Sequence, residues 1–260
     1  MTVTDAFIGL VRGPENALHL DHAALLLAAH ATPGLDVSAG LDRLDDLALR
    51  CPEPTLGGLR HLLFDEMGFA GDTEDYSDPR NSFLDQVLDR RRGIPISLSV
   101  LMMEIGRRVG VPLEGVGMPG HFLVRHTVAP RVLIDPFHGG RVLDADQCAD
   151  LFSTLFGMTA PLPASVLDAA RPRAILARML ANLKQSYVER RDPASLLWVG
   201  RLRAAIPGVD PREMAQLAQT LVNFGRFGEA ADALEELAAA HGEGGKSMWV
   251  QARALRARLN

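Results

Sequence analysis

One amphipathic helix, followed directly by strand-like segments, limits the folds open to this chain more than any other feature. Charged side chains at Glu104, Arg107 and Arg108 take one face of the segment, and Gly110 ends it. The apolar residues at helical spacing are Leu98, Leu101, Met102, Ile105 and Val109. After Gly110 the pattern changes to short runs rich in β-branched and aromatic residues. We therefore expect a helix that packs on a core, beside strands.

Three short strands are predicted after this helix. They cover Val111–Val116, Phe122–Thr127 and Arg131–Ile134. The turn-forming stretches Met118–Gly120 and Ala129–Pro130 separate them. We expect these strands to form a small antiparallel sheet.

Helical patterns flank this region on both sides. Before it, apolar residues return every three or four positions in Leu18–His30, Val37–Leu49 and Leu56–Met67. A further helix is predicted over Phe83–Arg91, because Asn81 and Ser82 are good capping residues. After it, a helix is predicted over Ala145–Phe156, and the proline-containing stretch Ala160–Ala170 is expected to be a linker.

The C-terminal third is predicted to be entirely helical. Its segment Phe224–Ala230 is typical of the hinge between the two helices of a tetratricopeptide unit. Small Ala218 and Ala230 occur where two such helices must approach closely. One unit cannot bury its own apolar face, so we expect it to stack on the helices predicted over Pro172–Arg190 and Lys246–Leu259.

Composition and charge exclude several classes of protein. Apolar stretches such as Ala23–Ala29 are far shorter than a membrane span, so no membrane insertion is expected. A formal net charge of −5 gives no electrostatic footprint for nucleic acid. Cys51 and Cys148 form no Cys-x-x-Cys pair, and the first residues lack the features of a secretory signal. A cytoplasmic location is therefore expected.

Three positions follow the layout of an acyl-transfer site. Pro95 begins the long helix, His121 precedes a predicted strand and Asp135 follows another. In cysteine and serine enzymes of this layout, the nucleophile stands at a helix N-terminus that stabilises a thiolate or an oxyanion. The histidine takes the proton and the acid orients the histidine. His121 and Asp135 are thus the candidate catalytic residues.

Four sequence blocks resemble the SirB-type bacterial family, whose transglutaminase-like core precedes a tetratricopeptide-like tail. The blocks are DPRNSFL at 78–84, RRGIPISL at 91–98, GVGMPGHFLVR at 115–125 and IDPF at 134–137. The resemblance implies that His121 and Asp135 are carried over from the superfamily's catalytic set. It also implies that the position of the catalytic cysteine, counted back from Gly110, is occupied by Pro95.

With this resemblance, the predicted fold class is α+β. It combines a helical N-terminal part, a papain-like or transglutaminase-like core with a small antiparallel sheet, and an all-α tetratricopeptide-like C-terminal region. We expect a transglutaminase-like domain over residues 1–160 and a tetratricopeptide-like helical region over residues 172–260.

Proline at position 95 removes the nucleophile. It has no reactive side chain and no backbone N–H for an oxyanion, although its fixed φ suits a first helical turn. Ser97 is turned away from position 95 around the helix and is expected to hydrogen-bond within the first turn. Cys148 is expected to be a small buried packing residue. Neither is a convincing substitute.

No metal site is predicted. His121, His126, Asp135 and His138 lie close together in the sequence, but the first two are separated by an odd number of positions along a strand and so face opposite sides.

Other candidate residues concern binding. Arg80 and Arg125, with Ser97, are candidates for a site that holds an anionic ligand beside the vacant nucleophile position.

The leading hypothesis is a non-catalytic transglutaminase-like protein that binds a protein or peptide partner through the residual cleft or the helical tail. The alternative is a cysteine- or serine-type amide hydrolase or acyltransferase that uses Ser97 or Cys148 with His121 and Asp135. A third hypothesis treats the core as a scaffold, with the function carried by the tail alone. None of the three calls for a cofactor.

Overall fold

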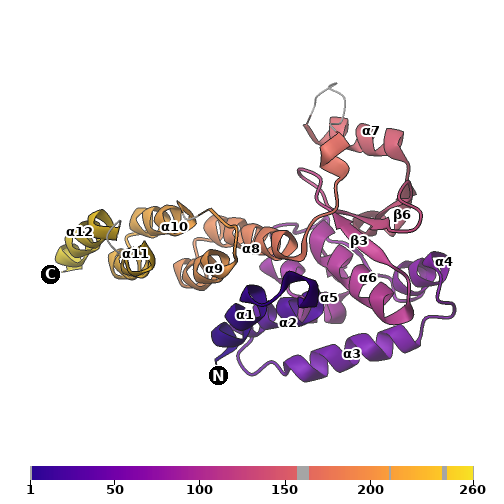
Figure 1. Ribbon diagram of the computed structural model, residues 1–260, viewed down its shortest axis with the longest axis horizontal. Coiled ribbons are helices and arrows are strands. Elements are labelled where there is room, and N and C mark those ends of the chain that lie inside the picture. The colour runs from indigo at the N-terminus through magenta and orange to yellow at the C-terminus, as the bar shows by residue number, and fades with distance from the viewer. Residues whose placement is uncertain (1, 157–163, 211, 242–244, 260) are drawn as a thin grey trace. The chain divides into compact units, whose positions relative to one another are not determined.

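The computed structural model describes residues 2–156, 164–210, 212–241 and 245–259 (Figure 1). Its fold class is α+β, as predicted: helices dominate, and two small sheets lie among them. The chain divides into two compact units. We call Asn16–Met179 the core unit, and Met1–Glu15 together with Leu180–Asn260 the helical unit. The domain limits proposed from the sequence stay a prediction.

Six helices of the core unit were expected from the sequence. They are α2 (Leu20–Ala31), α3 (Val37–Leu49), α4 (Leu56–Arg60), α5 (Leu84–Arg90), α6 (Pro95–Val109) and α7 (Ala145–Phe156). Helix α4 is shorter than expected because a π-helical stretch, His61–Glu66, continues it. Short 3-10 turns at Glu15–Ala17, Pro79–Ser82, Pro136–His138 and Ala164–Leu167 complete the connections.

Helix α6 is the centre of the core unit. It begins at Pro95 and ends at Gly110, whose positive φ of 82° suits glycine. Every residue from Pro95 to Gly106 is buried, including Glu104 on the face predicted to be polar. Glu104 tolerates this position because its carboxylate accepts the backbone N–H of Leu20 at 3.2 Å and the Nε–H of Arg107 at 2.8 Å.

A four-stranded antiparallel sheet packs near α6. Its strands follow in chain order: β3 (Leu113–Val116), β4 (Leu123–His126), β5 (Leu133–Asp135) and β6 (Arg141–Leu143). The last strand was not predicted. A second, parallel pair joins β1 (Ala70–Gly71) to β2 (Arg92–Gly93).

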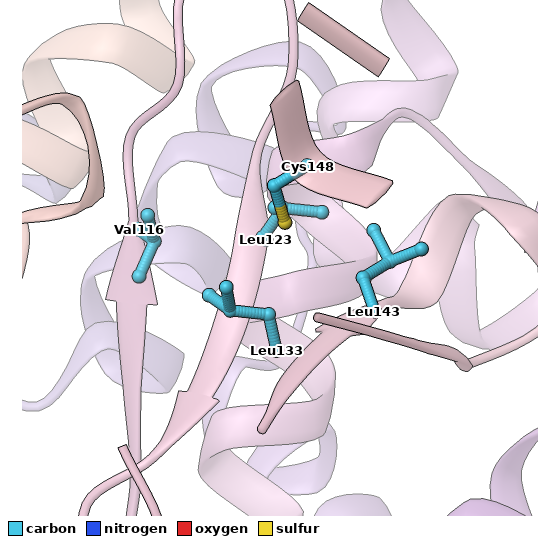
Figure 2. Close-up of a cluster of buried hydrophobic side chains, with 5 residues drawn as sticks. All are labelled: Val116, Leu123, Leu133, Leu143 and Cys148. Atoms are coloured by element: carbon cyan, nitrogen blue, oxygen red, sulfur yellow. The ribbon is translucent and has the colours of Figure 1, made fainter. Parts of the chain in front are cut away.

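One face of the larger sheet is closed by α7. Val116, Leu123, Leu133 and Leu143 come from the four strands, and Cys148 of α7 packs among them (Figure 2). All five side chains are at most 3% exposed. Burial of this apolar layer holds the sheet, and with it the loops at its edges, in place.

The helical unit is built from consecutive helices. After α8 (Pro172–Glu189), whose residues up to Met179 belong to the core unit, come α9 (Pro193–Ala205), α10 (Arg212–Asn223), α11 (Phe227–His241) and α12 (Lys246–Arg256). From α9 to α12 each helix packs on the next (Figure 1). Helix α1 (Val3–Arg12), which was not predicted, packs on α9.

The predicted hinge of the tail is a tight turn between α10 and α11. Gly225 adopts a φ of 72° in this turn. That the two helices form a tetratricopeptide unit stays a prediction. Of the predicted linker, residues 160–163 lie outside the described part of the chain. Among the described residues, no helix combines the length and apolar character needed to cross a membrane.

Candidate functional site

His121 and Asp135 meet at one edge of the antiparallel sheet. His121 lies just before β4, and Asp135 is the last residue of the neighbouring strand β5. Their side chains are hydrogen-bonded, with 2.9 Å between His121 Nε2 and Asp135 Oδ1. Because an ionised carboxylate only accepts, Nε2 of His121 is the donor in this hydrogen bond. This is the orientation that a general base of an acyl-transfer site requires.

Asp135 is fully buried and its carboxylate is densely hydrogen-bonded. Besides His121, its Oδ1 accepts the backbone N–H groups of Phe137 at 3.1 Å and His138 at 3.3 Å. Burial raises the pKa of Asp135, but the hydrogen bonds and positive charge offered by His121 and His138 outweigh burial and hold the pKa below its usual value. The carboxylate is therefore ionised at neutral pH.

A second histidine binds the same carboxylate. Nδ1 of His138 lies 2.7 Å from Oδ2 of Asp135. Asp135 caps the 3-10 turn Pro136–His138, and this turn brings the ring back onto the acid. The two histidines differ in access, since the His138 side chain is 49% exposed and that of His121 only 5%. The sequence signal for this contact is an aspartate followed by proline, with histidine three positions on.

Aromatic rings cover the buried histidine. The ring centroid of Phe137 lies 6.1 Å from that of His121 and 5.1 Å from that of His138, and both ring pairs are T-shaped. Tyr76 packs on Phe137 at 5.9 Å. Phe137 fits here because position 71 is glycine: a Cβ on Gly71 would stand 2.4 Å from its ring.

Arg178, which sequence reasoning missed, holds the backbone of the histidine loop. Its Nη2 donates to the carbonyl oxygens of Met118 and His121, both at 2.7 Å. Its guanidinium also lies over the ring of Phe122, 5.4 Å from the centroid. Burial lowers the pKa of Arg178. No local motif marks this residue, because the loop and α8 are far apart in the sequence.

The position expected for the nucleophile has none. Helix α6 begins at Pro95, which is buried and carries no reactive group. Ser97 is also buried, and its hydroxyl accepts the N–H of Ile94 at 3.1 Å and donates to the carbonyl of Asn81 at 2.6 Å. None of the hydrogen bonds that the structure describes for Ser97 reaches His121.

This arrangement can be compared with known proteins. Residues 26–181 match the family model of the transglutaminase-like superfamily. The chain belongs to this superfamily. The matched residues include the central helix α6, the antiparallel sheet, and His121 and Asp135 at its edge.

Relatives include bacterial and mammalian proteins. A UPF0162 protein of Xylella fastidiosa is 36% identical over 86% of this chain and 83% of its own length. A UPF0162 protein of Pseudomonas aeruginosa is 36% identical over 68% of each chain. Human F-box only protein 21 is 31% identical over 63% of this chain, which corresponds to 28% of its own length. No solved structure matches the chain.

Cys148 of this transglutaminase-like protein is a packing residue. It is fully buried in the apolar layer between α7 and the sheet (Figure 2). Burial, followed by the negative charges of Asp144 and Asp135, raises the pKa of its thiol to about 11. The thiol is therefore neutral at physiological pH and a poor nucleophile.

The two arginines predicted to bind an anion are engaged elsewhere. Arg125 donates to Glu114 at 2.6 Å and to the carbonyl of Leu167 at 2.9 Å. Arg80 donates to Asp78 at 2.7 Å. The interactions described for them do not include His121, Asp135 or His138, so an anion site formed with Ser97 stays a prediction.

Proposed function

We propose that this protein is a non-catalytic member of the transglutaminase-like superfamily that binds a protein or peptide partner. The observation that carries the proposal is Pro95 at the start of α6, with the His121–Asp135 pair intact at the sheet edge. Without a nucleophilic side chain at this position, no acyl-enzyme intermediate can form there. We place the protein in the cytoplasm as part of the proposal, because both cysteines are free thiols.

The substitute nucleophiles support this proposal rather than the hydrolase alternative. The hydroxyl of Ser97 is used in the first turn of α6 and is 0% exposed. The thiol of Cys148 is buried, and its raised pKa keeps it protonated. His121 itself is 4% exposed. A substrate carbonyl would therefore have to displace covering side chains before it met the base.

The helical unit supplies a surface suited to a partner. A recess of about 390 Å³, which we call the tail recess, lies among α10, α11 and α12. Its lining is mostly apolar, with glutamine and arginine among its members: Ala215, Ala218, Gln219, Val222, Leu234, Gln251, Ala254, Leu255 and Arg258. Apolar pockets with a few polar groups are typical binding sites.

The first experiment tests the tail recess in the full-length protein. Partners captured from lysate are identified and purified, and their affinity for Ala254→Arg is compared with wild type. Ala254 is exposed and lines the recess, so a long cation there should block binding without disturbing the core. Ala194→Arg on α9 is the matched control, because Ala194 is an exposed helical alanine outside the recess. Equal affinity of both variants and wild type would contradict the proposed surface.

The second experiment tests the absence of catalysis. Native protein is treated with a fluorophosphonate probe and with iodoacetamide, and the labelled peptides are mapped by mass spectrometry. The proposal expects no label on Ser97 and none on Cys148. Labelling of either residue that disappears in His121→Ala would instead support the hydrolase or acyltransferase.

A further inference from the structure

His121, Asp135 and His138 form the one group of three potential metal ligands that converges within the described part of the chain. One ring nitrogen of each histidine and a carboxylate oxygen all lie within 4.8 Å of one another. From this geometry we propose that the three residues bind a divalent transition-metal ion, with Zn²⁺ the best match. The sequence analysis compared His121 with His126, whereas in the structure the turn after β5 brings His138 to the same carboxylate.

The donor set selects the class of metal. Two imidazole nitrogens and one carboxylate oxygen suit Zn²⁺ and its neighbours, whereas Mg²⁺ and Ca²⁺ prefer oxygen ligands alone. Three protein ligands leave at least one position open for water or an external group. The proposed site is therefore a three-ligand centre with an accessible position.

The distances are close to those of a metal centre. Zn–N bonds of about 2.0–2.1 Å and Zn–O bonds of about 2.0–2.2 Å put neighbouring ligand atoms roughly 3 Å apart. Here Nε2 of His121 lies 2.9 Å from Oδ1 of Asp135 and Nδ1 of His138 lies 2.7 Å from Oδ2, and the ligand atoms of the three residues lie within 4.8 Å of one another. Small rotations of the rings would thus turn two hydrogen bonds into two coordinate bonds. Each neutral imidazole would carry its proton on the opposite ring nitrogen, with no net gain or loss of protons.

The ligands are already held in place. Asp135 is fixed by the backbone N–H groups of Phe137 and His138. The carbonyl of His121 is fixed by Arg178 at 2.7 Å. A site whose ligands are ordered before the metal arrives loses little conformational entropy on binding.

The site also has a route for entry. His138 lines a polar recess of about 360 Å³ that lies within the core unit. The other lining residues are Arg141, Gln147, Asp150, Leu151 and Thr154. The His138 side chain is 49% exposed, so it is the first of the three ligands that an ion entering through this recess meets.

The experiment uses metal-free full-length protein and two probes. Zn²⁺ is titrated by calorimetry and Co²⁺ by visible absorption, where a site with nitrogen and oxygen ligands gives distinct bands. We expect one equivalent of either ion to bind, and Mg²⁺ not to compete. His138→Ala should weaken Zn²⁺ binding about tenfold or more, since even the loss of an outer-shell partner costs about 10–100-fold.

The matched control is His61→Ala. His61 is exposed and lies beside two carboxylates, with 3.1 Å to Asp65 and 3.4 Å to Glu66, so it is the natural place for adventitious binding. The proposal expects this variant to bind like wild type. It is overturned if wild type binds no Zn²⁺, if His138→Ala binds as tightly as wild type, or if His61→Ala loses the bound equivalent. Circular dichroism of His138→Ala verifies that the variant is folded.

Discussion

Ser97→Ala is the most direct test of the role assigned to this serine. The substitution removes a hydroxyl that is 0% exposed, accepts the N–H of Ile94, and shares its one proton between the carbonyls of Asn81 at 2.6 Å and Ile94 at 3.1 Å. Each such bond contributes about 0.5–1.5 kcal/mol to stability. The carbonyl of Asn81 keeps a partner, since the N–H of Ile94 also reaches it at 3.3 Å. No buried acceptor is left unpaired, so we expect a loss of about 2 kcal/mol rather than more.

The assay is urea and thermal denaturation of the full chain followed by circular dichroism. For a chain of this size, about 2 kcal/mol corresponds to a fall of about 4–8 °C in Tm. Ser99→Ala is the matched control, because Ser99 is two residues along the same helix and equally buried. Its Oγ has no hydrogen-bond partner among the described residues. Removing it should change stability by less than about 0.5 kcal/mol or increase it.

Two results would refute this reasoning. If Ser97→Ala and Ser99→Ala lower the Tm equally, the hydrogen bonds of Ser97 make no measurable contribution to stability. If Ser97→Ala leaves stability unchanged but abolishes labelling by a fluorophosphonate, the serine is a nucleophile and not part of the helix start.

Three further predictions concern other parts of the molecule. Gly140→Ala should lower the free energy of unfolding by about 3 kcal/mol or more, because φ is +69° and the new Cβ would stand 2.2 Å from the ring of Phe64. Gly139→Ala should lower it by about 1 kcal/mol, because only its φ of +67° is unfavourable for alanine. Urea denaturation of the two variants measures the difference. Cys148 should react with Ellman's reagent only after unfolding, since its pKa is raised to about 11. Burial raises the pKa of Glu213, but hydrogen bonds from Arg203 and Lys184 outweigh burial and hold the pKa below the usual 4.5. The stability that the ionised carboxylate contributes is therefore present above pH 4.5 and is lost as the pH falls through the lowered pKa. Glu213→Gln should lower the free energy of unfolding by about 1 kcal/mol at pH 7 and not at all in strong acid, which thermal unfolding at the two pH values measures.

Each of these has a clear contradicting outcome. Equal stability of the two alanine variants would mean that the phenyl ring moves aside freely. Rapid modification of two thiols in native protein would place Cys148 at an accessible surface. A difference in stability between Glu213→Gln and wild type that persists in strong acid would show that packing, not charge, is responsible.

Much of the fold could be predicted because it depends on local patterns. Helices α3 and α7 begin and end where apolar periodicity places them, and α6 begins at a proline and ends at a glycine as both residues favour. Strand β6 was missed because three residues carry too little alternation to be recognised. The shortened α4 was missed because no residue type marks the change to a π-helical turn.

The candidate site was predicted only in part, because some of its contacts are not marked by any local sequence pattern. His121 and Asp135 could be named from their places beside strands. The contact between His138 and Asp135 depends on a tight turn, and the support from Arg178 comes from a helix far along the chain. Long-range contacts of single side chains leave no periodic trace in a sequence.

The grouping of α1 with the C-terminal helices has a consequence for how the chain folds during synthesis. Phe7 and Val11 are fully buried, and α1 packs on α9. During synthesis α1 is made before α9, and the whole core unit lies between them, so at about 5–20 residues per second α9 follows on the order of ten seconds later. Until then the apolar face of α1 has no partner within its own unit. The contact between α1 and α9 can therefore form only late, after the whole core unit has been made.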